Sequence, residues 1–129
     1  MLIKLFKIYL QKLRNYVLGD FRSKKLSQLI VKKIIKHNKK KCIKIVDYGT
    51  GYQPKVVLFV YDQLVKIYKK KIIIDCYDFY SQRDLKKLNS FKKKDINFYN
   101  INSIGKNKKK YDFCLINDVI HHIGIEKET

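Results

Sequence analysis

The stretch IKIVDYGTGYQP, residues 43–54, decides the fold predicted for this chain. Its apolar beginning ends in the acid Asp47, and two glycines follow at alternate positions, Gly49 and Gly51. Glycine is needed where the backbone turns sharply or lets a ligand lie against it. Pro54 suits the first position of a helix, where its missing N–H is not needed. The pattern predicts a strand, a tight glycine turn and a helix, with a small ligand across the carboxyl end of the strand.

Strand-like and helix-like segments alternate along the rest of the chain. Apolar runs predict strands at residues 42–47, 72–78, 96–101 and 111–117. Amphipathic segments predict helices after Pro54 and after Ser81, where Ser81 and Asp84 resemble a capping box. This alternation indicates βαβ units, an α/β fold and a parallel sheet with right-handed crossovers.

Residues 1–40 form a separate N-terminal region, and residues 41–129 form the predicted cofactor-binding domain. The apolar spacing of the N-terminal region predicts two amphipathic helices, interrupted at Gly19-Asp20, with Ser23 capping the second. We expect these helices to act as a lid over the domain. A pair of basic amphipathic helices is also compatible with peripheral contact to a membrane surface.

Charge and cysteine usage narrow the class of protein. The 129 residues carry a formal net charge of +19, but the lysines are spread along the chain in short runs at expected loops. This spread favours solvated loops over binding of nucleic acid.

The three cysteines, Cys42, Cys76 and Cys114, lie in separate apolar runs without metal-ligand spacing, so we expect buried thiols in a reducing, cytoplasmic compartment and no metal site. No apolar run is long enough to span a bilayer.

A polar side chain stands at the carboxyl end of each of the four predicted strands. The carboxyl ends of parallel strands share one edge of the sheet. An acid at the end of the second strand is placed to accept hydrogen bonds from a ribose diol. We prefer Asp78 for this role, because the apolar strand continues to Tyr77, and Asp75 is the alternative. An Asn on the third strand is placed to meet an adenine edge. The pattern indicates a nucleoside-containing cofactor, and the polar residues are Asp47, Asp75 or Asp78, Asn100 or Asn102, and Asn117.

Two motifs in this order, DYGTG at residues 47–51 and YDFCLINDVIHHI at residues 111–123, resemble the S-adenosylmethionine-dependent methyltransferases of the Rossmann-like class. The resemblance covers about residues 42–123. It implies a three-layer sheet with strand order 3-2-1-4. The family's sheet normally has seven strands, so the last three are expected to be missing and the chain to be truncated.

The resemblance also implies a set of cofactor-binding residues for S-adenosyl-L-methionine. Asp47, Gly49 and Gly51 would surround its methionine part, Asp78 would bind the ribose hydroxyls, Asn100 would lie near the adenine, and Asn117 near the methionine part or the sulfonium. Two departures from the family pattern are Gln53 at the third glycine position and an Asn in place of the third-strand acid.

The function implied is methyl transfer to a small molecule, a sugar or a lipid-linked metabolite. The fourth motif lacks the Asn/Asp-Pro-Pro-aromatic signature of enzymes that methylate exocyclic amino groups, which weighs against DNA bases as acceptors. His121 or His122 would face the substrate as a base or serve in packing. The catalytic residues, the acceptor and the oligomeric state are not readable from the sequence.

Three other functions compete with methyl transfer. A nicotinamide-dependent Rossmann oxidoreductase would need a third glycine where this chain has Pro54. A basic RNA-binding module would need a contiguous patch of lysines on one face. The expected truncation also allows an inactive cofactor-binding remnant.

Overall fold

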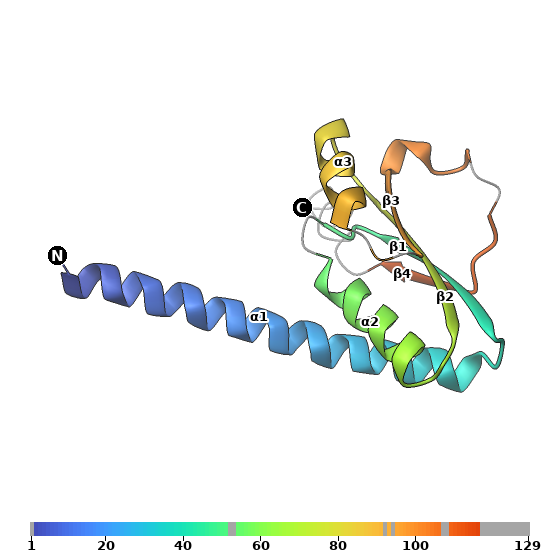
Figure 1. Ribbon diagram of the computed structural model, residues 1–129, viewed down its shortest axis with the longest axis horizontal. Coiled ribbons are helices and arrows are strands. Elements are labelled where there is room, and N and C mark those ends of the chain that lie inside the picture. The colour runs from blue at the N-terminus through green and yellow to red at the C-terminus, as the bar shows by residue number, and fades with distance from the viewer. Residues whose placement is uncertain (1, 52–53, 92, 94, 107–108, 117–129) are drawn as a thin grey trace, which may run out of the picture.

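The computed structural model describes residues 2–51, 54–91, 93, 95–106 and 109–116, with the backbone alone described for residues 11–20 and Phe91. Three α-helices, a short 3₁₀ helix and four strands follow one another along this part of the chain (Figure 1). In order they are α1 (Leu2–His37), β1 (Cys42–Tyr48), α2 (Lys55–Lys66), β2 (Lys71–Asp78), α3 (Gln82–Phe91), β3 (Ile96–Asn100), η1 (Ile101–Ser103) and β4 (Phe113–Ile116).

The four strands form one parallel sheet in the order β3-β2-β1-β4, which confirms the predicted α/β class and strand order. Asp47 of β1 is paired in register with Cys76 of β2, and Asp78 of β2 with Asn100 of β3. Because all strands run the same way, their carboxyl ends lie along one edge of the sheet. This edge is called the carboxyl edge below.

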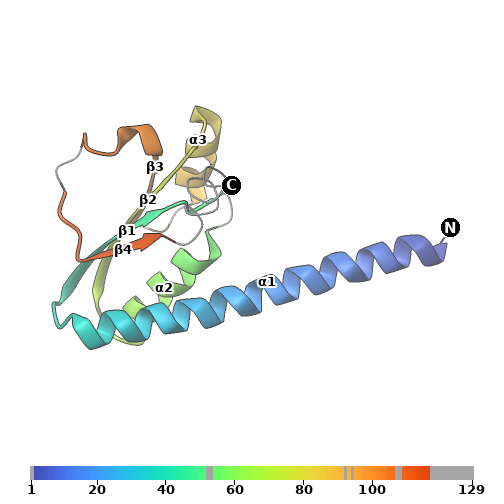
Figure 2. The ribbon, with the colours of Figure 1, turned by 180° about the vertical axis from the view of Figure 1, so that it is seen from behind.

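One face of the sheet holds the hydrophobic core. Alternate strand residues point to this face and pack against α1 and α2, and Leu85 and Leu88 of α3 join them. Figures 1 and 2 show the helices gathered on this side of the sheet. The most deeply buried members are Ile34, Ile43, Ile45, Val57, Val60, Leu64, Ile72, Ile74, Cys76 and Ile96.

The opposite face carries no α-helix in the part of the chain that is described, and it is called the helix-free face below. The connection from β3 to β4 supplies only η1 and a loop, which Figure 1 shows on the side away from the helices. A row of tyrosine rings crosses this face, with centroids 5.7 Å apart for Tyr48 and Tyr77 and 5.3 Å apart for Tyr77 and Tyr99. The predicted three-layer arrangement is therefore wrong for the described residues, which make two layers.

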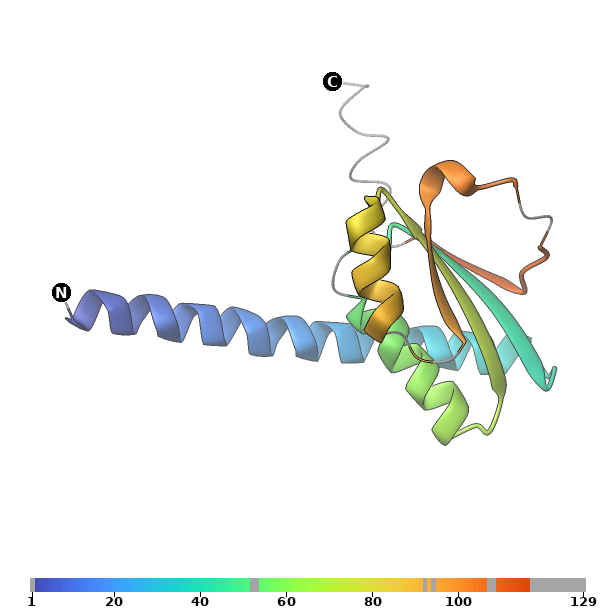
Figure 3. The same cartoon turned by 45° about the horizontal axis from the view of Figure 1, so that its top comes forward.

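The N-terminal region is one continuous helix, α1, and not the two helices predicted. Gly19 and Asp20 lie inside it, because a glycine costs a helix only about 1 kcal/mol relative to alanine. The end of α1 is anchored in the core by Val31 and Ile34, whereas its beginning extends away from the domain in all three views (Figures 1–3). In this arrangement α1 does not cover the carboxyl edge as the expected lid.

The ends of the other helices follow local rules that are readable in the sequence. Ser81 and Asp84 form the predicted capping box: the Ser81 amide donates to the Asp84 carboxylate at 3.0 Å, and the Asp84 amide donates to Ser81 Oγ at 3.1 Å. Pro54 is the N-cap of α2, one position before its first helical residue, and its carbonyl accepts from the Leu58 amide at 3.1 Å.

The three cysteines are free thiols, but they are not all buried as expected. Cys76 lies in the core, where burial and the Asp47 charge raise the pKa of its thiol. Cys42 is half-buried and Cys114 is exposed. The prediction of a buried Cys114 is wrong because its alternate position in β4 is on the helix-free face, as its register with Val46 shows.

Candidate functional site at the carboxyl edge

The glycine turn after β1 is held against the end of β2. Gly49 and Gly51 have φ angles of 82° and 77°, a left-handed conformation that disfavours residues with a Cβ. The Gly49 amide donates to the Tyr77 carbonyl at 2.8 Å, and Thr50 Oγ1 donates to Asp47 Oδ2 at 2.9 Å. Asp47, which is only 3% exposed, therefore stabilises the turn through its contact with Thr50.

Asp78 meets this turn from the neighbouring strand. The Gly51 amide donates to Asp78 Oδ2 at 2.7 Å, and the Phe79 amide donates to Asp78 Oδ1 at 2.7 Å. Each carboxylate oxygen has a second lone pair, so both can still accept from a ligand hydroxyl. Phe79, whose amide contacts this carboxylate, is 66% exposed, which is unusual for a phenylalanine.

Tyr80 and Asn100 connect the loop after β2 to the same glycine turn. The Tyr80 hydroxyl donates to the Gly51 carbonyl at 2.6 Å, and burial raises the pKa of this hydroxyl, so it stays a donor. Asn100 Nδ2 donates to the Tyr80 carbonyl at 2.6 Å, while Asn100 Oδ1 accepts from the Asn102 amide at 2.9 Å. Asn100 thus shapes the edge, and Asn102 contributes its backbone.

These residues fit a nucleoside-containing ligand. A Cβ built on Gly51 would meet no atom within 4 Å, so there is open space beside the turn. The Asp78 carboxylate, which can accept hydroxyl hydrogens, contacts the turn at Gly51, and the next residue in the chain, Phe79, is an exposed aromatic. Acceptors for a ribose diol and a flat apolar surface for a base are what a nucleoside requires.

Sequence reasoning missed Thr50, Phe79 and Tyr80 at this edge. Thr50 lies between the two glycines, and a hydroxyl three residues after an acid is a recognisable turn signal. Phe79 follows the acid that ends β2, so its place at the edge was readable although its exposure was not. The link from Tyr80 to Gly51 joins residues 29 positions apart, and no local pattern reveals it.

Asp75, the alternative ribose ligand, lies elsewhere. It is fully buried in the middle of β2 and points to the helix-free face, where Tyr111 donates to it at 2.6 Å and Asn97 at 3.1 Å. Lys109 Nζ lies 3.3 Å from the same carboxylate. The sequence predicts that whichever of Asp75 and Asp78 does not bind the ribose is a solvated loop acid. That prediction is wrong for Asp75, because the loop before β4 covers it.

Several predicted residues lie outside the described part of the chain. These are Gln53, Asn117, His121 and His122. Among the described residues, no group of three or more His, Cys, Asp or Glu side chains could hold a metal ion.

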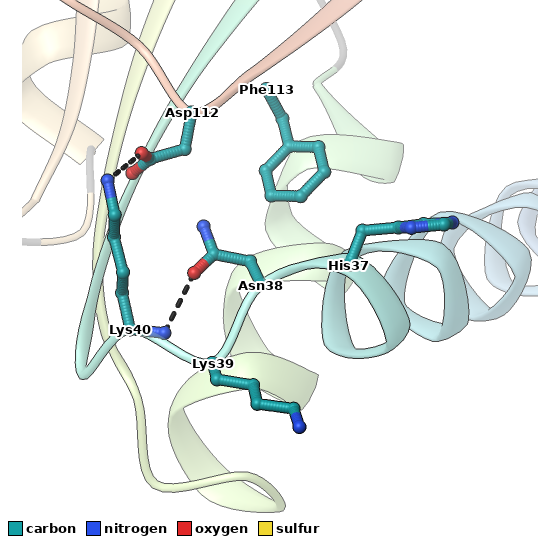
Figure 4. A pocket seen from close by; sticks show the side chains of 6 residues that line it. All are labelled: His37, Asn38, Lys39, Lys40, Asp112 and Phe113. Carbon is teal, nitrogen blue, oxygen red and sulfur yellow. Dashed lines mark hydrogen bonds and ion pairs between the residues drawn. The ribbon is translucent and has the colours of Figure 1, made fainter.

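A shallow pocket of about 650 Å³ lies at the opposite, amino end of the strands (Figure 4). It is formed where α1 ends and β4 begins, and its lining includes His37, Lys39 and Phe113. Lys40 Nζ lies 2.7 Å from Asp112 Oδ1, and the Lys44 amide donates to Asp112 Oδ2 at 3.0 Å. Asp112 therefore holds the start of β4 against β1 and the residues before it. The pocket lies at the other end of the strands from the glycine turn.

Comparison with protein families finds no family model that matches this chain, and comparison with curated proteins finds no match either. Within the described ranges, no helix combines the length and the apolar character needed to cross a membrane.

The turn geometry predicts a cost for a side chain at Gly51. Replacing Gly51 with Ala should lower the free energy of unfolding by about 1–2 kcal/mol, since the left-handed conformation is strained although the space is open. Gly105→Ala, at a φ of 87° in equally open space, is the matched control and should cost about the same in urea unfolding. A stable Gly51→Ala beside a destabilised Gly105→Ala would contradict the turn conformation.

The Asp112 contacts predict a pH-dependent contribution to stability. The Lys40 ammonium and the Lys44 amide hold the pKa of Asp112 below its usual value. A lowered pKa stabilises the folded chain above the unfolded value of about 3.9, and this contribution is lost as the pH falls through the folded value. Asp112→Asn should therefore cost about 1 kcal/mol at pH 7, and less at pH 3, in urea unfolding. An equal cost at both pH values would contradict this role.

Proposed function

We propose that this chain binds S-adenosyl-L-methionine at the carboxyl edge of its sheet and transfers the methyl group to a small molecule, a sugar or a lipid-linked metabolite in the cytoplasm. The observation that carries the proposal is the contact between the Gly51 amide and the Asp78 carboxylate, beside open space. It joins the glycine turn and the strand-ending acid that the family resemblance assigns to one cofactor. The strand order β3-β2-β1-β4 supports the same assignment.

Several described residues of the edge have a part in the proposed binding, either directly or by holding the turn. Asp78 accepts the ribose hydroxyls, using the lone pairs that the Gly51 and Phe79 amides leave free. The exposed side chain of Phe79, the residue after Asp78, offers a base an aromatic surface to pack against. Gly49 and Gly51 let the chain of the cofactor approach the backbone closely, and Asp47 fixes the turn through Thr50.

S-adenosylmethionine, when bound, supplies a methyl group on a sulfonium, which is a good leaving group. The contribution of the protein is then mainly alignment of the acceptor in line with that methyl group. The turn and the end of β2 are suited to this because they are cross-linked by three hydrogen bonds, from Gly49, Gly51 and Tyr80.

The nicotinamide-dependent alternative has weaker support. Its fingerprint places a glycine three residues after the second glycine of the turn, where the helix packs closely on the strand. In this chain Pro54 occupies that place and caps α2. An RNA-binding module is separated from methyl transfer by the absence of S-adenosylhomocysteine binding, and an inactive remnant by an assay of methyl transfer.

Titration calorimetry with S-adenosylhomocysteine, the demethylated product, tests binding directly. The wild-type chain should bind it, and Asp78→Ala should weaken binding roughly tenfold to a hundredfold, as expected for loss of hydrogen bonds to a charged group. Asp62→Ala is the matched control, because Asp62 lies on α2, outside the site, where it makes an ion pair with Lys93. Circular dichroism of each variant checks that the fold is retained.

The same titration, repeated with NAD and followed by an assay of methyl transfer, distinguishes the alternatives. Binding of NAD without binding of S-adenosylhomocysteine would overturn the proposal in favour of an oxidoreductase. Absence of binding to either would also overturn it. Binding of the product, together with failure of the chain to transfer a methyl group to any acceptor, would leave a cofactor-binding remnant and overturn the enzymatic part.

A further inference from the structure

The beginning of α1 is an exposed apolar arm. Residues 2–10, called the arm below, contain seven large apolar side chains and two lysines, Lys4 and Lys7. A monomeric soluble protein rarely exposes so many neighbouring apolar side chains without a partner for them. Their exposed fractions are Leu2 85%, Ile3 74%, Leu5 61%, Phe6 61%, Ile8 45%, Tyr9 63% and Leu10 46%.

The arm stands clear of the folded domain. α1 meets the domain toward its other end, where Lys24 Nζ lies 5.6 Å from the centre of the Phe59 ring and Gln63 donates to Ser27 Oγ at 2.9 Å. At 1.5 Å per residue, roughly 30 Å of helix separates Leu2 from Lys24. All three overall views show this part of α1 extending away from the sheet (Figures 1–3). A large surface can therefore reach the arm without colliding with the domain.

The charges around the arm are of one sign. Lys4 and Lys7 are three positions apart and share one side of the helix, leaving a broad apolar surface around the rest. Asp20 is the single acidic residue of α1, and the whole chain carries a net charge of +19. The surface that covers the arm should therefore be apolar at the point of contact and negatively charged around it.

We propose that the arm binds the surface of an anionic lipid membrane. A helix with apolar side chains flanked by lysines inserts at the boundary between headgroups and acyl chains, and anionic lipids attract its lysines. Nine residues are too few to span a bilayer, so the arm lies in the interface. A second copy of the chain is a poorer occupant, because it would bring another +19 charge against these lysines.

Vesicle sedimentation of the full chain tests this proposal without any methyl donor. The chain should bind vesicles of phosphatidylcholine with phosphatidylglycerol and should bind pure phosphatidylcholine vesicles much less. Leu5→Gln with Phe6→Gln should weaken binding to the anionic vesicles roughly tenfold or more, because two apolar side chains no longer leave water. Glutamine keeps the helix propensity of the arm.

Ile67→Gln with Ile104→Gln is the matched control, since these side chains are 66% and 45% exposed but lie outside α1. This control should bind as the wild type does. The chain contains no tryptophan, so Phe6→Trp supplies a single reporter whose emission should shift to shorter wavelength on anionic vesicles. Equal binding to both vesicle types, or no shift of the reporter, would overturn the proposal. Light scattering that shows a dimer lost in Leu5→Gln with Phe6→Gln would overturn it in favour of a second copy.

This test contains no nucleoside, so its failure would not contradict the proposed cofactor binding. Failure of the calorimetric test would likewise not contradict membrane binding by the arm.

Discussion

The hydrogen bond from the Gly51 amide to the Asp78 carboxylate is the contact on which the carboxyl edge depends. It joins two residues 27 positions apart, at the ends of neighbouring parallel strands. The left-handed φ of Gly51 lets the turn close over the end of β2, which a residue with a Cβ would resist. This contact brings the acceptor oxygens of Asp78 next to the open space beside the turn.

The two faces of the sheet are stabilised by different means. On the helix side, aliphatic side chains from every layer leave water, which is the main source of stability. On the other face, Asp75 is buried beneath Tyr111, and the aromatic rings of Tyr77 and Tyr99 pack across neighbouring strands. A buried carboxylate needs such hydrogen bonds, since leaving it unpaired would cost several kcal/mol. Polar contacts from the loop before β4 thus cover this face of the sheet, as the α-helices cover the other face.

Much of the fold could be predicted because its signals are local. Alternating strand and helix patterns determine the parallel sheet, and the Ser81–Asp84 capping box marks the start of α3. The continuity of α1 could not be predicted, because the cost of Gly19 is small against the rest of a 36-residue helix. At the site, the acid and the glycines were readable, whereas the Tyr80 contact depends on tertiary packing. The burial of Asp75 depends on a loop that the sequence places only approximately.

The proposed methyl transfer requires that the residues of the carboxyl edge converge around a nucleoside. Amide chemical shifts recorded by ¹⁵N NMR during titration with S-adenosylhomocysteine test this most directly. We expect the largest changes at Gly49, Gly51 and Phe79, whose amides line the turn and the end of β2. Changes confined to the pocket near Lys39 and Phe113 at the amino end, or no changes at all, would contradict the account.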